Sequence, residues 1–302
     1  MTHDGSITAV GTRMDSYYGR PILKEPVWQP EIPCYFFTGG LAGASSVLHL
    51  VASLLGHKKL ARRSLFIGAA ADAVSPVLLV SDLGRPERAL NMFRVFKVTS
   101  PMSVGSWILL VSGGASSTAA ALELLGKLKP VKVLAEIVAA ATGPPLATYT
   151  GTLIADTSIP VWHEARHELP WLFGSSAGAS AGAAAVVAVP PDEAGPARRL
   201  TVGGVIAELA LMQAMEQRIG FVGEVYKRGA AGKLGRVAKV CAASGAALLA
   251  TRGKRSRFAA VGGGALVLAG ELALRWSVFR AGFQSARDPR YVVEPQRERK
   301  TR

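Results

Sequence analysis

A short polar segment between two apolar stretches gathers side chains that can exchange protons. From Gly151 to Gly182 the chain reads GTLIADTSIPVWHEARHELPWLFGSSAGASAG, with Trp162, His163 and His167 in its polar part. The two histidines are four residues apart. This spacing fits metal ligands, polar residues at a helix end, or residues at the mouth of a binding site. An imidazole titrates at about pH 6.5, which suits proton exchange with a bound ligand. Histidines lying in interfacial water would give the same pattern, so these interpretations stay open.

Four acidic residues, Asp72, Glu136, Glu208 and Glu271, lie inside apolar stretches. A charged side chain at the centre of a membrane helix costs about 2.5–3.5 kcal/mol on insertion scales, so such residues are usually functional. Arg275 follows Glu271 by one helical turn, which favours a structural ion pair there. The depth of each acid in the membrane can be counted from the expected cytoplasmic end of its apolar stretch, at about 1.5 Å per residue. This depth increases from Glu136 through Glu208 and Asp72 to Glu271. This order predicts a proton path made of the four acids and Arg275.

Apolar helices must position these residues, because the composition is that of a membrane protein. Of the 302 residues, 49% are hydrophobic and 19% charged, whereas soluble domains carry about 25% charged residues. A helix needs about 20 apolar residues to cross a bilayer. The sequence therefore predicts an all-α integral membrane protein with eight transmembrane helices, at 32–55, 64–80, 104–125, 133–154, 169–188, 200–221, 237–250 and 258–279.

The eight stretches divide into two sets of four. The tetrapeptide AGAS occurs at 42–45 and again at 177–180, and the buried acids recur at nearly the same offset. Small residues also pack helices closely, so AGAS alone has an ordinary packing explanation. Together the repeats predict two four-helix bundles. The expected organisation is an N-terminal segment, a first bundle, a connector, a second bundle and a basic tail, over 1–31, 32–154, 155–168, 169–279 and 280–302.

Many of the positive charges behind the net charge of +14 lie in the loops between apolar stretches, so this charge does not indicate a nucleic-acid-binding protein. Segments 56–63, 126–132, 189–199 and 251–257 together hold 13 Lys or Arg in 33 residues. Short loops rich in Lys and Arg mark the cytoplasmic side of a membrane protein. We therefore expect a multi-pass protein of the cell membrane with both termini on the non-cytoplasmic side. The first 31 residues contain no pattern of a cleaved signal peptide.

Cysteine and histidine usage predicts that this chain binds no redox metal. Cys34 and Cys241 lie in separate apolar stretches without a CxxC spacing, so no iron–sulfur or zinc framework is expected. His49 is the one histidine within a predicted span, whereas a membrane haem would need two facing imidazoles.

Several segments together resemble one family of membrane proteins. They read YFFTGGLAGAS, SDLGRPER, SPMSVGSW, YTGTLIADTSIPVW, LPWLFGSSAGASAG and AGFQSARDPRYVVEPQR. Over about 32–295 the chain is similar to the membrane subunits of polysulfide reductases, the NrfD-like family. The resemblance implies a subunit that handles quinone or quinol without a metal of its own. It further implies two partners, a ferredoxin-like subunit with [4Fe–4S] clusters and a molybdopterin catalytic subunit.

The resemblance also implies where a quinone would bind. In the family, polar residues at the start of the first helix and a tyrosine of the fourth contact the quinone, which correspond here to the Glu31–Tyr35 stretch and Tyr149. This sequence reads EIPCYFF where the family has a polar Asn/His pair. The expected quinone site comprises Glu31, Tyr35, Tyr149, Asp156, Trp162, His163 and His167. The expected docking site for the iron–sulfur partner comprises Asp82, Arg85 and Arg88.

The function that this implies is electron exchange between membrane quinone and a peripheral iron–sulfur subunit. Two alternatives remain. The chain is a structural anchor if its quinone site has degenerated. It is a secondary transporter if the two repeats, the acids and the break at Gly143-Pro144-Pro145 serve alternating access.

Overall fold

A computed structural model of the protein describes residues 22–301, with side chains up to residue 297, and this part is helical without strands. Eight of its helices are long. They are α1 (Glu31–Leu54), α2 (Lys58–Ser81), α3 (Pro101–Leu125), α4 (Lys129–Ala155), α6 (Leu169–Ala188), α7 (Gly195–Arg218), α8 (Gly229–Thr251) and α9 (Arg257–Arg287). Shorter helices lie in the connections and at the C-terminal end: η1 (Pro86–Phe93), α5 (Pro160–Glu164), η2 (Gly220–Lys227) and α10 (Arg290–Thr301).

Six of the long helices, α1, α2, α3, α6, α8 and α9, are long and apolar enough to cross a membrane. The other two carry residues that interrupt an apolar surface: α4 contains Glu136 and two adjacent prolines, and α7 contains Glu208 and Glu216. The expectation of an all-helical, multi-pass membrane protein is thus confirmed. That all eight helices cross the membrane, in two separate bundles, stays a prediction.

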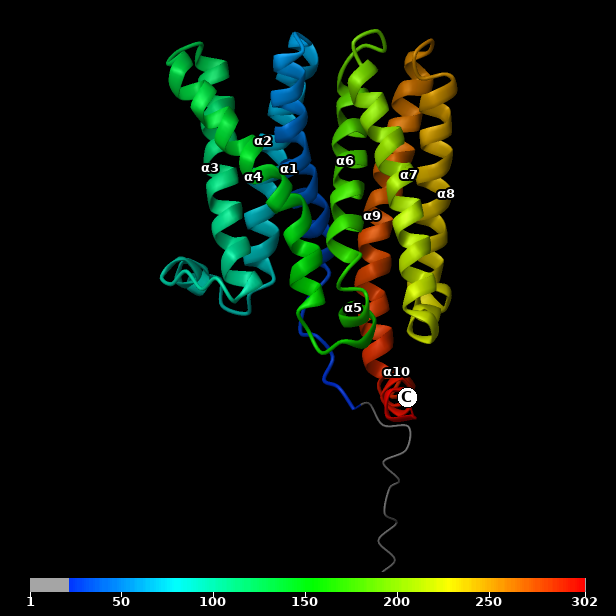
Figure 1. Ribbon diagram of the computed structural model, residues 1–302. Coiled ribbons are helices and arrows are strands. Elements are labelled where there is room, and N and C mark those ends of the chain that lie inside the picture. Colours follow the sequence, from blue (N-terminus) through cyan, green and yellow to red (C-terminus); the bar gives the residue numbers. More distant parts are fainter. Residues whose placement is uncertain (1–21, 302) are drawn as a thin grey trace, which may run out of the picture.

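The two halves of the chain repeat one pattern of neighbours. In the first half α1 packs on α2 and α4, and α3 completes the set by packing on both of these. In the second half α6 packs on α7 and α9, with α8 against both. The long helices lie side by side in Figure 1, with α6 joining the halves through its contacts with α1 and α4.

Small residues allow the closest helix crossings. A Cβ atom added at Gly43 of α1 would lie 2.3 Å from the carbonyl oxygen of Gly143 in α4, so the two backbones touch there. Gly43 belongs to the first AGAS segment, whose packing role is therefore real. Pro144 and Pro145 follow this crossing, yet α4 continues to Ala155 without unwinding.

The connections are short at one end of the molecule and long at the other (Figure 1). At the end with the short connections, Arg257 at the start of α9 links α9 to α6. Its guanidinium donates hydrogen bonds to the carbonyl oxygens of Val186, Val187 and Val189 at the end of α6. At the long end lie η1, α5, η2, α10 and residues 22–30. Which end faces the cytoplasm stays a prediction.

Candidate functional site

A cavity opens inside the first half of the molecule, close to the end with the long connections. It holds about 590 Å³ of atom-free space, including the part open to the outside. The walls come from four long helices and the segments beside them: Trp28, Ile32, Tyr35, Phe36, Leu79, Asp82, Leu83, Met92, Met102, Ser106, Tyr149 and Leu153. Most are apolar or aromatic, with a few polar groups among them, as is usual for a small-molecule site.

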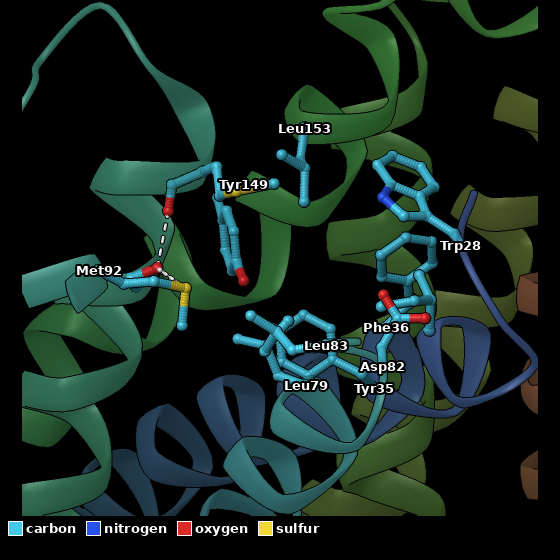
Figure 2. Close-up of a pocket in the computed structure, with 12 residues that line it drawn as sticks. Trp28, Tyr35, Phe36, Leu79, Asp82, Leu83, Met92, Tyr149 and Leu153 are labelled. Carbon is cyan, nitrogen blue, oxygen red and sulfur yellow. Dashed lines mark hydrogen bonds between the residues drawn. The ribbon is translucent and has the colours of Figure 1, made fainter. Parts of the chain in front are cut away.

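Tyr149 projects from α4 into this cavity, and Figure 2 shows its hydroxyl directed toward the space beside Leu83. The ring occupies a slot opposite Gly105 of α3. A Cβ atom at Gly105 would lie 2.0 Å from the ring carbon Cε2, so only glycine leaves room for the ring. This explains the glycine in the SPMSVGSW segment, which the sequence alone left without a role.

Tyr35 and Asp82 also bring polar groups to the cavity. The side chain of Tyr35 is fully buried, and its hydroxyl has no hydrogen-bond partner among the described residues. Asp82, directly after α2, accepts a hydrogen bond of 2.7 Å from the backbone N–H of Gln29. Burial raises the pKa of Asp82, the Gln29 N–H opposes this, and the nearby Glu31 carboxylate raises it further. Asp82 therefore takes up a proton more readily than a solvated aspartate does.

Tyr149 also borders a second, more open cavity of about 1350 Å³. Asp156, His163 and His167 line it together with Arg166, and all four side chains are exposed. The structure thus brings most of the polar residues expected at the quinone site to one end of α4. Tyr149 thus lines both the more enclosed cavity and the more open one.

Two residues expected at the quinone site line neither cavity. Trp162 is fully buried, donates a hydrogen bond of 2.8 Å to the carbonyl of Val278, and stacks on Trp28 at 5.6 Å between ring centroids. It supports the cavity wall from behind, since Trp28 lines the cavity. Glu31 begins α1 with one buried oxygen that has no hydrogen-bond partner within the described part of the chain.

The acids expected to form one proton path occupy three separate places. Asp72 of α2 is buried and accepts hydrogen bonds from Ser116 at 2.6 Å and Ser112 at 3.3 Å, both on α3. In the part of the chain that the structure describes, its other oxygen has no hydrogen-bond partner and no cation faces this carboxyl.

Glu136 of α4 lies near the short-connection end beside two basic groups. Its Oε1 atom is 3.0 Å from Nε2 of His49 and 3.4 Å from Nζ of Lys132. Nδ1 of His49 lies 2.8 Å from the carbonyl oxygen of Ala61, which can only accept, so Nδ1 carries a proton. Lys132 also pairs with Glu123, which brings this group to the surface.

Glu208 and Glu271 meet in the second half of the molecule. Their carboxyl groups lie within hydrogen-bonding reach of each other, and Ser176 donates to Glu271 at 2.5 Å. Arg275 instead packs its guanidinium on the ring of Phe173, 3.8 Å from the centroid, and donates to the Phe173 carbonyl. Among the described residues, Glu271 and Arg275 do not form the expected ion pair within 4 Å. Their charges are nevertheless close enough to interact. The cluster is fully buried.

The residues expected to dock a partner are divided. Arg85 and Arg88 are exposed at the start of η1, which projects at the long-connection end (Figure 1). Asp82 turns into the cavity instead. Within residues 22–297 no group of three or more His, Cys, Asp or Glu side chains is arranged to hold a metal ion.

Sequence reasoning missed most of the cavity wall. Leu79, Met92 and Met102 come from segments far apart in the chain and carry no distinctive chemistry. Ser106 and Trp28 could have been recognised from the sequence, because they are a polar and an aromatic residue near predicted helix ends.

Comparison with known proteins identifies the family. No curated protein matches this sequence. Residues 23–222 match the family described as Polysulphide reductase, NrfD. The match begins before α1 and extends through α7 into η2, leaving α8, α9 and α10 outside it. Because the match covers well over half of the chain, the protein belongs to the polysulphide reductase NrfD family.

Proposed function

We propose that this protein is the membrane subunit of a quinone-linked oxidoreductase and exchanges electrons between a membrane quinone and a peripheral iron–sulfur subunit. The observation that carries the proposal is the apolar cavity bordered by Tyr149, Tyr35 and Asp82. Family membership supports the general class of function. The cavity supports a working quinone site over a structural anchor, because an anchor needs no enclosed space with polar groups.

The residues of the cavity suit a quinone head group. A bound quinone supplies two-electron, two-proton chemistry at its ring oxygens. The hydroxyl of Tyr35 is buried without a partner and can donate to such an oxygen. Aromatic and aliphatic side chains enclose a flat ring and exclude water. Asp82 lines the cavity and has a raised pKa, so its carboxyl binds a proton more readily than a solvated aspartate and can exchange it with the ligand.

Replacing Tyr149 with Phe tests the site while keeping the ring in its slot. We expect quinone-dependent turnover to fall about 10- to 100-fold, the loss for a hydrogen bond to a charged or charging oxygen. Activity of the assembled complex with a soluble dye that bypasses the membrane subunit should be unchanged.

Tyr226→Phe is the control, because Tyr226 lies in η2, outside the cavity, and its buried hydroxyl has no partner among the described residues. Equal activity of Tyr149→Phe and wild type with quinone would favour the structural anchor.

We propose that η1 and the residues after it dock the iron–sulfur partner. This segment places Arg85 and Arg88 beside Leu90, Val95 and Phe96, whose side chains are all exposed. Exposed apolar groups among positive charges are typical of a surface that another protein covers. The segment contains Met92, which lines the cavity, so a docked partner is within reach of the proposed quinone site.

The double variant Arg85→Ala, Arg88→Ala should release the iron–sulfur partner from membranes, because electrostatic attraction orients docking partners. The amount of partner that co-purifies with the tagged membrane subunit is the measurement. Arg252→Ala, Lys254→Ala serves as a control with the same charge change at the opposite end. Full retention of the partner by the first variant contradicts this docking surface.

We further propose that the buried acids carry protons between the two ends. Asp72, Glu136 and the Glu208–Glu271 pair are separated in the structure, so water must complete any such path. Several buried oxygens and nitrogens in these clusters lack partners, as groups that hold water do: Asp72 Oδ1, Glu208 Oε2, Glu271 Oε1, and Nε and Nη1 of Arg275.

A further inference from the structure

A basic groove lies between the two halves at the short-connection end, far from the quinone cavity. Lys59, Arg62 and Arg63 line it from the first turns of α2, with Phe66 one turn further along. The opposite wall is formed by Ala188, Val189 and Pro190 at the end of α6. The groove holds about 960 Å³ of atom-free space, including the part open to the outside.

The charges of the groove are incompletely paired within the protein. Nζ of Lys59 lies 2.6 Å from Glu193, and Nε of Arg62 lies 3.4 Å from Glu123. Arg63 is exposed and makes no ion pair with the described residues. Glu193 and Asp192 thus act on Lys59, and Glu123 acts on Arg62, while Arg63 has no acidic partner among the described residues. The guanidinium of Arg63 is therefore available to an anion.

The C-terminal end of α6 would normally repel an anion, because its last carbonyl oxygens carry partial negative charge. Here Arg257 donates to the carbonyls of Val186, Val187 and Val189, and Val189 is itself a wall of the groove. Arg257 therefore satisfies these oxygens and adds a positive charge nearby. Arg63 on one wall and Arg257 behind the other thus place two positive charges where an anion can approach.

From this arrangement we propose that the groove binds the head group of an anionic phospholipid. The groove lies where two apolar helices end, at the level of lipid head groups. Its positive charges complement a phosphate, while Phe66, Val189 and Pro190 offer an apolar surface to the lipid below it. Basic pockets between membrane helices bind lipid head groups in this way. Such a lipid bridges α2 and α6, and hence the two halves.

The test titrates the full-length protein in detergent with phosphatidylglycerol or phosphatidylcholine and counts bound lipids by native mass spectrometry. We expect wild type to bind phosphatidylglycerol about tenfold more tightly than phosphatidylcholine. Arg63→Gln should weaken phosphatidylglycerol binding about fivefold, the effect of one charge at a membrane surface. The triple variant Lys59→Gln, Arg62→Gln, Arg63→Gln should lose the preference.

Arg199→Gln is the matched control, because Arg199 is exposed at the same end but lies outside the groove. Equal binding of the two lipids by wild type, or an unchanged preference in the triple variant, overturns the proposal. Inorganic phosphate at millimolar concentration should not displace the lipid. If it does, the site binds free phosphate and the lipid assignment is wrong.

A second measurement covers the case in which the triple variant is unstable. Phosphatidylglycerol carrying a photoreactive acyl chain should label wild-type peptides from α2 and the end of α6. Labelling confined to other helices contradicts the proposal.

Discussion

Gly105→Ala should abolish most quinone-dependent activity although residue 105 carries no functional group. The added methyl would lie 2.0 Å from Cε2 of Tyr149, and the next ring atoms are 2.5 and 2.7 Å away. The ring must therefore leave its slot. A displacement of about 1 Å at a reacting group can lower a rate about 100-fold, which is the loss that we expect in quinone-dependent turnover. Overpacking should also cost about 1–3 kcal/mol of stability.

Gly114→Ala separates the two effects, because Gly114 lies on the same helix and a Cβ there meets nothing within 4 Å. Quinone-dependent and dye-dependent activities of both variants are compared, together with their melting temperatures. Gly105→Ala with normal quinone activity would show that the position of the Tyr149 ring is unimportant and would remove the main support for the site.

Asp72→Asn should stop proton uptake from the short-connection side during turnover while the complex still assembles. Asparagine keeps the shape of the side chain, and its oxygen can still accept the hydrogen bond from Ser116. It cannot bind and release a proton, so a path through Asp72 is interrupted. The measurement is proton movement in sealed vesicles that contain the whole complex, followed together with electron transfer.

Asp192→Asn is the control, because Asp192 is an exposed carboxylate in the loop after α6. Ser116→Ala provides a milder change, since it removes one hydrogen bond but leaves the carboxyl in place. Wild-type proton movement with Asp72→Asn would reduce Asp72 to a structural partner of α3.

The positions of the long helices could be predicted from hydropathy, while their ends could not. The second and seventh apolar stretches were expected to begin at 64 and 237, but α2 begins at Lys58 and α8 at Gly229. Both helices start with turns that contain basic residues, which hydropathy assigns to loops. Long basic side chains reach the interface from a helix end, so the helices extend beyond their apolar parts.

The candidate site could be predicted only where a residue has distinctive chemistry. Tyr149 and Tyr35 were expected and lie at the cavity, whereas Leu79, Met92 and Met102 were not, because apolar side chains give no signal of a site. Asp82 was assigned to the docking surface from its charged neighbours. Its hydrogen bond with Gln29 depends on a long-range contact that no local pattern reveals.

The backbones of α1 and α4 touch at Gly43 and Gly143. This contact divides α4 into two parts. Neither helix can slide at this point without a clash, and the two prolines that follow it remove backbone hydrogen bonds. The segment from Leu146 to Ala155, which carries Tyr149, is held separately by a second close backbone contact, where a Cβ atom at Gly151 would lie 2.6 Å from the carbonyl oxygen of Leu169. We expect ligand entry to change the amide hydrogen exchange of the residues of α4 that follow this contact. The exchange of the residues before it should stay unchanged. A rearrangement at the cavity is therefore not expected to shift the charged groups at the other end, and we infer that protons and water, rather than helix movement, connect the two ends.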